Sequence, residues 1–93
     1  MITTSQKELI LRTLKKYNPT SVGIFGSYAR GKNTSSSDLD ILVDFNNTPD
    51  LLEIIGIEQS LTEALGIKVD LITTRSLHPG LKEYVEMDLI ELV

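Results

Sequence analysis

Residues 23–45 read GIFGSYARGKNTSSSDLDILVDF, and the rest of the chain is arranged around this stretch. The apolar run over residues 22–25 has the composition of a strand, and Gly26-Ser27 ends that run with a turn. The next three residues suit the first turn of a helix, which presents free backbone N–H groups and the positive end of a dipole to phosphate oxygens. This turn is therefore a candidate phosphate-binding element, to which the Ser27 hydroxyl and the Arg30 charge would contribute.

The second apolar run begins with two aspartates, Asp38 and Asp40, which a single leucine separates. Residues 38–43 have strand composition, and on a strand residues i and i+2 project from the same face. The two carboxylates therefore lie side by side and repel each other unless a cation lies between them. Mg2+ takes oxygen ligands and commonly joins one or two carboxylates to substrate phosphates. The stretch thus predicts a phosphate-binding turn and a metal-binding strand that form one site.

Ten residues separate Gly26-Ser27 from Asp38-Leu39-Asp40. This spacing resembles the signature of the nucleotidyltransferase superfamily, which includes DNA polymerase beta and kanamycin nucleotidyltransferase. The fuller form, GSYARG followed by SSSDLDILVDF, resembles the minimal nucleotidyltransferase (MNT) proteins, which are stand-alone catalytic domains of about this length. The resemblance extends over nearly the whole chain. Either element alone is a weak signal, whereas both together at this spacing are a specific one.

Length and composition limit the classes of protein that this chain fits. Ninety-three residues suit one small domain, so we expect a single unit over residues 1–93. The chain has no cysteine, which excludes disulfides and thiolate metal sites. Its N-terminal segment lacks both a continuous apolar run and a small-residue cleavage site, so we expect no signal peptide, no membrane span and a cytoplasmic location. The net charge of −4 argues against binding of a long nucleic acid, whereas Mg2+ would cancel part of the charge of a small nucleotide.

The spacing of apolar residues predicts two long helices, one on each side of this stretch. The first covers residues 5–17 and begins with a capping box at Ser5. The second follows Thr48 as its expected N-cap, carries Pro49 at its first position and ends at Gly66. Each helix has an apolar face, so we expect both to pack against the strands.

The remainder of the chain completes a mixed pattern of helices and strands. Residues 67–73 predict a third strand, and a short final helix is expected to begin at Leu77 or Pro79 and to run through Met87. Residues 89–93 fit either an edge strand or a continuation of that helix. This order predicts an α/β or α+β sandwich. The resemblance adds the polymerase beta-like nucleotidyltransferase fold, a small mixed β-sheet with helices packed on one side and the active site on the open side.

Asp70 is a polar residue within the apolar third strand. In the family that the chain resembles, a third carboxylate arises here, beside the strand with the paired aspartates. The resemblance therefore implies that Asp38, Asp40 and Asp70 hold two Mg2+ ions and that Asp70 is the general base. Asp44 faces the same side but lies roughly 13 Å from Asp40 along the strand, so we interpret it as a structural or surface acid. The residues that the resemblance assigns to the β- and γ-phosphates of ATP are Gly26, Ser27 and Arg30.

The tyrosines and the only histidine leave two interpretations open. Tyr17, Tyr28 and Tyr84 each fit either stacking on a nucleobase or packing at the core or its rim. His78 lies next to a proline at a predicted helix start, and we interpret it as a surface residue rather than a catalyst.

The resemblance also implies an activity and a partner. MNT proteins are found beside HEPN-domain ribonucleases, act as their antitoxins and are described as attaching AMP from ATP to a tyrosine of the toxin. The chain has no acceptor-binding domain, so we expect a hetero-oligomer or a homo-oligomer to supply the missing wall. Two alternatives remain: a non-enzymatic antitoxin that neutralises its partner by binding, and a small-molecule nucleotidyltransferase. The retained acidic residues argue against the first, and the missing acceptor domain argues against the second.

Overall fold

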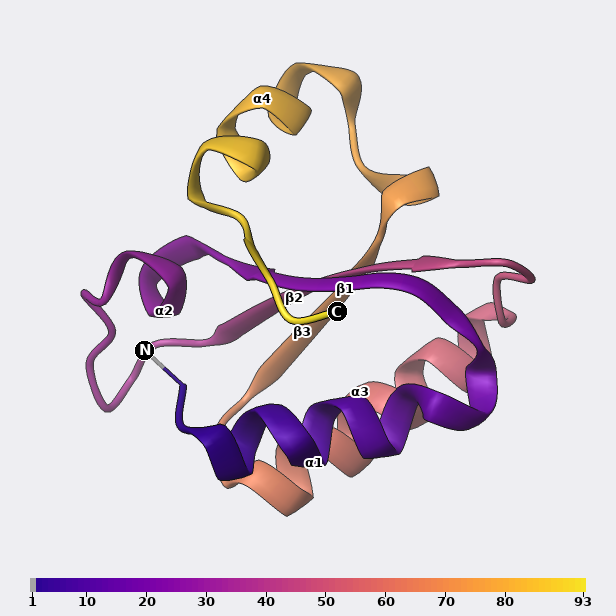
Figure 1. Cartoon of the computed structure of the whole chain (residues 1–93), viewed down its shortest axis with the longest axis horizontal. Coiled ribbons are helices and arrows are strands. Elements are labelled where there is room, and N and C mark those ends of the chain that lie inside the picture. The colour runs from indigo at the N-terminus through magenta and orange to yellow at the C-terminus, as the bar shows by residue number, and fades with distance from the viewer. Residues whose placement is uncertain (1) are drawn as a thin grey trace.

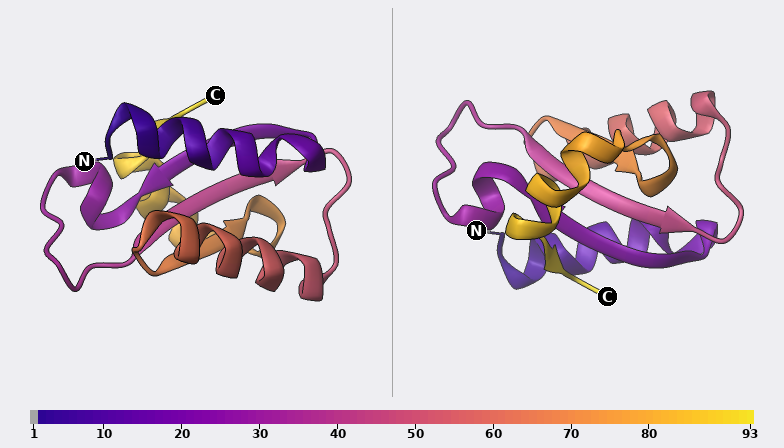
Figure 2. Two further views of the ribbon diagram at one scale, coloured as in Figure 1. Left: turned by 90° about the horizontal axis from the view of Figure 1, so that it is seen from below. Right: turned by 90° about the horizontal axis from the view of Figure 1, so that it is seen from above.

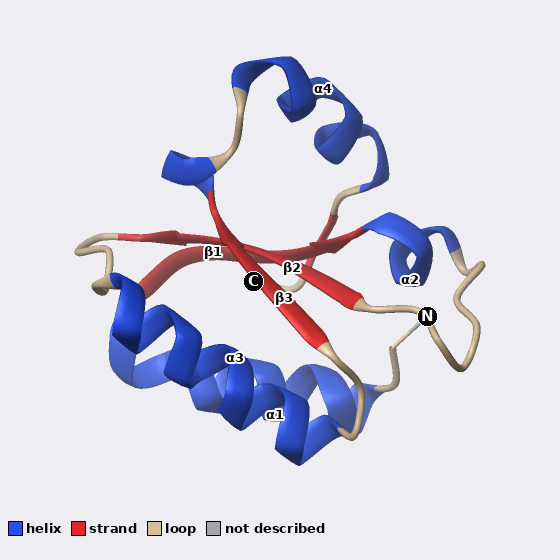
Figure 3. Cartoon of the chain, turned by 180° about the vertical axis from the view of Figure 1, so that it is seen from behind, coloured by secondary structure: helices blue, strands red, loops and turns tan. Residues whose placement is uncertain are grey.

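A four-stranded mixed β-sheet forms the centre of the computed structural model, which describes residues 2–93 (Figures 1 and 3). The strand order is β3-β2-β1-β4, with β1 antiparallel to β2 and β4, and β2 parallel to β3. The strands are β1 (Pro19–Phe25), β2 (Leu39–Phe45), β3 (Val69–Thr73) and β4 (Ile90–Glu91). The mixed sheet predicted from the sequence is confirmed, and the ambiguous C-terminal segment supplies the edge strand β4.

Two long helices cover one face of this sheet, and a shorter helix lies over the other (Figures 1 and 2). The covering helices are α1 (Thr4–Leu14), which continues into the 3-10 turn η1 (Lys15–Tyr17), and α3 (Leu51–Leu65). On the opposite side are α4 (Pro79–Asp88) and the 3-10 turn η2 (Thr74–Ser76), while the single-turn helix α2 (Gly26–Arg30) follows β1. The resemblance predicts that this second face of the sheet is open, whereas α4 covers part of it.

The first helix begins one residue earlier than the sequence predicts. Thr3 is the N-cap, and the capping box is reciprocal: the Gln6 N–H donates to Thr3 Oγ1 at 3.1 Å, and the Thr3 N–H donates to Gln6 Oε1 at 2.8 Å. The prediction of a capping box at Ser5 is wrong, because Ser5 lies inside the helix. The sequence contains two overlapping matches to the capping pattern, and local spacing alone does not choose between them.

The start of α3 also differs from the prediction. Asp50 is the N-cap, and its carboxylate accepts a hydrogen bond from the Glu53 N–H at 2.8 Å. A carboxylate satisfies a free N–H group there and also interacts favourably with the positive end of the helix dipole. The predicted cap at Thr48 is therefore wrong. The predicted end at Gly66 is confirmed, since that residue has a φ of 69° and caps the helix.

Side chains alternate between the two faces of β2, and this alternation separates the core from the polar face. Leu39, Ile41 and Val43 are fully buried on the side of α1 and α3. Asp40 and Asp44 alternate with them, and therefore project to the other side of the sheet, toward α4. The buried side chains that pack with β2 from the two covering helices are Ile10, Leu14, Ile57 and Leu61. Burial of one face thus fixes the orientation of the acidic side chains on the other.

No helix within residues 2–93 is long and apolar enough to cross a membrane.

Gly23, in the middle of β1, allows the C-terminal segment to approach the sheet closely. A Cβ atom at this position would lie 2.6 Å from Leu89 Cδ1 and 3.1 Å from the Ile90 carbonyl oxygen. Gly23 and Glu91 are partners in the β1–β4 register. Because β4 follows α4 directly, this contact helps to determine where α4 lies over the sheet.

We predict that Gly23→Ala lowers the free energy of unfolding by about 1–3 kcal/mol, because the added methyl group overpacks the contact with β4. Gly56→Ala is the matched control, since a Cβ at Gly56 meets nothing within 4 Å and alanine favours a helix interior. That control should raise stability by roughly 0.5–1 kcal/mol. Denaturant titration of both variants measures the two changes. Equal stability of Gly23→Ala and wild type would contradict the close packing of β4.

Candidate active site

The turn between β1 and α2 lies directly against a carboxylate of β2. Gly26 has a φ of 74°, which glycine adopts without strain, and a Cβ atom there would collide with the Asp40 carboxylate. Glycine therefore meets two requirements at this position, a backbone conformation and a close approach. The turn that sequence analysis assigned to phosphates and the strand that it assigned to a metal are in contact.

The short helix α2 holds the other two predicted phosphate ligands. Ser27 lies in its single turn, which ends at Gly31 with a φ of 70°, and the Lys32 N–H closes the turn by donating to the Ser27 carbonyl oxygen at 2.9 Å. Arg30 ends the helix, and its guanidinium donates to Asp88 Oδ2 at 2.6 Å. Asp88 is the last residue of α4, so this ion pair joins α2 to the helix that roofs the sheet.

Asp88 carries no sequence pattern that marks it as part of the site. An acidic residue at the C-terminal end of a helix interacts unfavourably with the helix dipole, which is a weak indication that a cation stabilises it. That cation is Arg30, 58 positions away in the sequence, and local patterns do not reveal such a pairing.

The parallel register of β2 and β3 places Asp70 directly beside Asp40. Asp38 precedes β2 by one residue, and its Oδ2 lies 3.7 Å from Lys68 Nζ. The pKa of Asp40 is raised above its ordinary value, first because burial removes water from the carboxylate and then because the charges of Asp70 and Asp38 repel a third negative charge. The charge of Arg30 opposes this rise. The structure thus brings all three predicted carboxylates and the predicted arginine into one electrostatic neighbourhood.

The donor chemistry of this cluster fits Mg2+, although its side chains do not converge on one point. Within residues 2–93, no group of three or more Asp, Glu or His side chains is arranged to hold a metal ion. Asp40 and Asp70 nevertheless offer oxygen ligands whose mutual repulsion a hard cation would relieve. Binding of the same cation by Asp38 would compete with its ion pair to Lys68, and that pair is exposed and weak.

A cavity of about 270 Å³ lies between the Gly26 turn, β2 and α4. It is lined by Phe25, Gly26, Arg30, Asp40, Leu81, Tyr84, Val85 and Asp88. Three of the predicted site residues, Gly26, Arg30 and Asp40, thus share one cavity with four residues of α4. We take this cavity as the candidate active site.

Asp44 and His78 have structural roles outside this cavity, in agreement with their interpretation from sequence. Asp44 Oδ1 accepts a hydrogen bond from the Thr74 hydroxyl at 2.8 Å, which fastens β2 to η2. His78 is exposed and caps α4, since its Nδ1 accepts from the Gly80 N–H at 3.0 Å.

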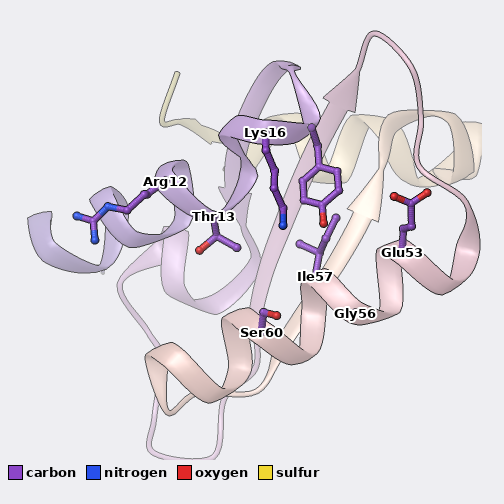
Figure 4. A pocket seen from close by; sticks show the side chains of 8 residues that line it. Arg12, Thr13, Lys16, Glu53, Gly56, Ile57 and Ser60 are labelled. Atoms are coloured by element: carbon purple, nitrogen blue, oxygen red, sulfur yellow. The ribbon is translucent and has the colours of Figure 1, made fainter.

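A larger groove, of about 430 Å³, lies between α1 and α3 on the opposite face of the sheet. Figure 4 shows Lys16 extending from the α1 side between the two helices, toward Ile57 and Ser60 on α3. The groove contains none of the predicted site residues, and the core of the protein separates it from Asp40. We therefore do not assign the chemistry of the site to it.

Comparison with known proteins identifies relatives that share nearly the whole chain. Residues 6–92 match the nucleotidyltransferase domain family. The protein adenylyltransferase MntA of Thermococcus cleftensis is 39% identical over 95 residues, which cover 97% of this chain and 96% of that protein.

Two solved structures have the same fold. A chain in the crystal structure of a toxin–antitoxin with AMP-PNP has a TM-score of 0.86 and 29% identity, over 94% of this chain and 72% of that chain. A chain in the structure of the tri-AMPylated Shewanella oneidensis HEPN toxin in complex with MNT antitoxin has a TM-score of 0.82 and 26% identity, over 99% of this chain and 72% of that chain.

We predict that Asp40→Asn raises the melting temperature by a few degrees at pH 7. Because the folded-state pKa of Asp40 lies above the unfolded value, the folded protein loses stability as the pH rises through the interval between the two. Asparagine removes this penalty, so the difference between variant and wild type should shrink as the pH falls and the aspartate takes up its proton. Thermal melts of both proteins from pH 4 to pH 8 measure this difference in melting temperature.

Asp44→Asn is the control, because it changes an aspartate of the same strand and face that lies outside the cluster. It should not raise the melting temperature. If Asp40→Asn were less stable than wild type at pH 7 without added metal, the crowding of charge around Asp40 would be refuted.

Proposed function

This chain belongs to the nucleotidyltransferase domain family, and from that premise we propose that it transfers AMP from ATP to a tyrosine hydroxyl of a partner HEPN ribonuclease toxin and so acts as an antitoxin. The observation that carries the proposal is the contact of the Gly26 turn with Asp40, in one cavity with Arg30 and beside Asp70. The name of the Thermococcus relative supports AMP transfer to protein, and the complex with an AMPylated HEPN toxin supports the partner.

The reaction is a substitution at the α-phosphorus of ATP. The phenolic oxygen of the acceptor tyrosine forms a bond to the α-phosphorus, and the bond from that phosphorus to the oxygen bridging the α- and β-phosphates breaks. Pyrophosphate leaves with the bonding electrons, and Asp70 takes the phenolic proton as general base. The product is a tyrosyl-AMP phosphodiester. This step requires alignment and charge stabilisation more than a covalent intermediate, which suits a small site of acids and one arginine.

The β- and γ-phosphates would bind at the turn between β1 and α2. The Gly26 backbone can approach a phosphate closely because it has no side chain, and the Ser27 hydroxyl and the Arg30 guanidinium would donate to the phosphate oxygens. Arg30 is already held by Asp88, so binding of phosphate exchanges one anionic partner for another. Stabilisation of the leaving pyrophosphate by these groups lowers the barrier to transfer.

Asp38, Asp40 and Asp70 would together hold Mg2+. We propose two such ions, as the family resemblance implies. When bound, the metal neutralises the triphosphate and the charge that develops on the leaving oxygen. Its arrival also relieves the repulsion among the three carboxylates.

The acceptor would come from a second protein, as in the complex of an MNT antitoxin with an AMPylated HEPN toxin that this chain resembles. The exposed apolar side chains of α4 next to the site, Leu81 and Tyr84, are available to complete a wall with that partner. A hetero-oligomer with the toxin is therefore part of the proposal, as is a cytoplasmic location, where ATP is supplied.

Neutralisation by binding alone is the second candidate function. It is favoured by the side-chain positions in residues 2–93, where the three carboxylates do not converge and both Asp38 and Arg30 have ion-pair partners. Under this alternative the fold is retained as a docking module, and AMP transfer is absent.

Intact-mass spectrometry of the product of the neighbouring reading frame, after incubation with the chain, ATP and Mg2+, separates the two candidates. We predict a mass gain in whole AMP units with wild type, and a rate at least about 100-fold lower with Asp40→Asn. Asp44→Asn, on the same strand but outside the cavity, should transfer AMP at close to the wild-type rate. A stable complex with no mass gain would establish the binding-only alternative instead.

A further inference from the structure

The cavity of the candidate active site has two chemically different ends. Arg30, Asp40 and Asp88 form a charged end at the Gly26 turn. The remaining lining side chains form an apolar and aromatic wall: Phe25, Leu81, Tyr84 and Val85. The proposed function uses the charged end for phosphates and assigns no part of the nucleotide to the wall.

The wall belongs to the face of α4 that is turned toward the sheet. Leu81, Tyr84, Val85 and Asp88 are spaced i, i+3, i+4 and i+7, so they form one stripe along the helix. Such a stripe is normally buried, and Val85 is only 7% exposed. Leu81 and Tyr84 are 55% and 71% exposed even though they line the cavity. The chain itself therefore leaves uncovered two large apolar side chains that line the cavity.

The size of the cavity suits part of a nucleotide rather than a whole one. Ligand pockets usually measure about 300–1,000 Å³, and this cavity of about 270 Å³ lies just below that range. A planar base fits such a space, while the sugar and phosphates continue to the charged end. Tyr84 precedes Asp88 by four residues, or about 6 Å along the helix axis, so the apolar and charged ends of the cavity adjoin each other.

Resting on the proposed function, we propose that the wall of α4 binds the nucleobase of the nucleoside triphosphate, with the ring of Tyr84 stacked on the base and the side chains of Phe25 and Leu81 bordering it. Aromatic rings stack on nucleobases through their π-faces, and this contact alone strengthens binding substantially. The charged end then orients the triphosphate toward Asp40, so the base and the phosphates contact different walls of one cavity.

The positions of the other two tyrosines support this assignment. Tyr28 is 7% exposed and belongs to the hydrophobic core. Tyr17 lines the groove between α1 and α3 on the other face, where Lys16 Nζ lies 5.2 Å from its ring centroid. Tyr84 is the only one of the three tyrosines of the chain that lines the cavity with Asp40. The structure thus chooses among the stacking candidates that the sequence left open.

The composition of the wall also predicts how bases are distinguished. The phenol of Tyr84 is its only polar side-chain group, so recognition depends on the area of the stacked ring more than on a pattern of hydrogen bonds. We therefore expect ATP and GTP to bind with similar affinity, and CTP, with a smaller ring, to bind more weakly.

Isothermal titration with three Mg2+-loaded ligands, ATP, CTP and inorganic tripolyphosphate, tests the inference. Tyr84→Ala should weaken ATP binding roughly 10-fold, the effect of losing one stacked aromatic ring, and leave tripolyphosphate binding unchanged. Tyr84→Phe should bind ATP like wild type, because the ring remains. Met87→Ala is the matched control, since Met87 is 82% exposed on the same helix but does not line the cavity. Because Tyr84 is exposed, its truncation should leave the fold intact, and circular dichroism checks that the variant is folded.

Two results would overturn the inference while leaving the proposed function intact: equal ATP affinity of Tyr84→Ala and wild type, or an equal loss of ATP and tripolyphosphate binding in that variant. Equal affinity of the wild type for ATP, CTP and tripolyphosphate would do the same, because no base would then contribute. If the wild type bound none of the three ligands, the proposed function and the inference would both be refuted.

Discussion

The contact between the Gly26 turn and the Asp40 carboxylate is the constraint on which the rest of the site depends. It requires a residue without a side chain and with positive φ at the end of β1, and an aspartate on the facing strand whose side chain points away from the core. Burial of Leu39, Ile41 and Val43 against α1 and α3 forces that orientation on Asp40. A register shift of one residue in β2 would turn the carboxylate into the apolar core, so the hydrophobic effect and the chemistry of the site select the same pairing of strands.

The second constraint is the crowding of negative charge. Asp40 and Asp70 are neighbours across parallel strands, Asp38 is close by, and only Arg30 offsets their repulsion of Asp40. Such an arrangement costs stability in a chain without ligands, and it is typical of sites that bind cations or cationic complexes. The ion pair of Arg30 with Asp88 links this charge balance to α4, and Gly23 sets the approach of the strand that follows α4. An ion pair and the close approach of β4 to Gly23 thus hold α4 over the sheet, with the cavity between them.

The parts of the structure that could be predicted from the sequence are those that a local pattern of residues determines. The two-residue period of the strand predicted that Asp38 and Asp40 share a face, and the Gly-Ser turn and its spacing to Asp38 led to the site hypothesis. Asp70 was singled out because it interrupts an apolar strand and because the resemblance implies a third carboxylate there, and its catalytic role stays a prediction. The caps of α1 and α3 were misplaced because Thr3 and Ser5, and likewise Thr48 and Asp50, are competing caps whose choice depends on how the helix packs. Asp88 and the cavity wall at Tyr84 were beyond sequence reasoning, since each depends on how α4 crosses the sheet, which no local pattern encodes.

The most direct test of the central claim is a crystal structure of the chain with Mg2+ and a non-hydrolysable ATP analogue. The account predicts phosphates between the Gly26 turn and Arg30, the metal on Asp40 and Asp70, and Asp88 no longer paired with Arg30. An analogue bound in the groove between α1 and α3, or phosphates held without Gly26 and Arg30, would contradict it.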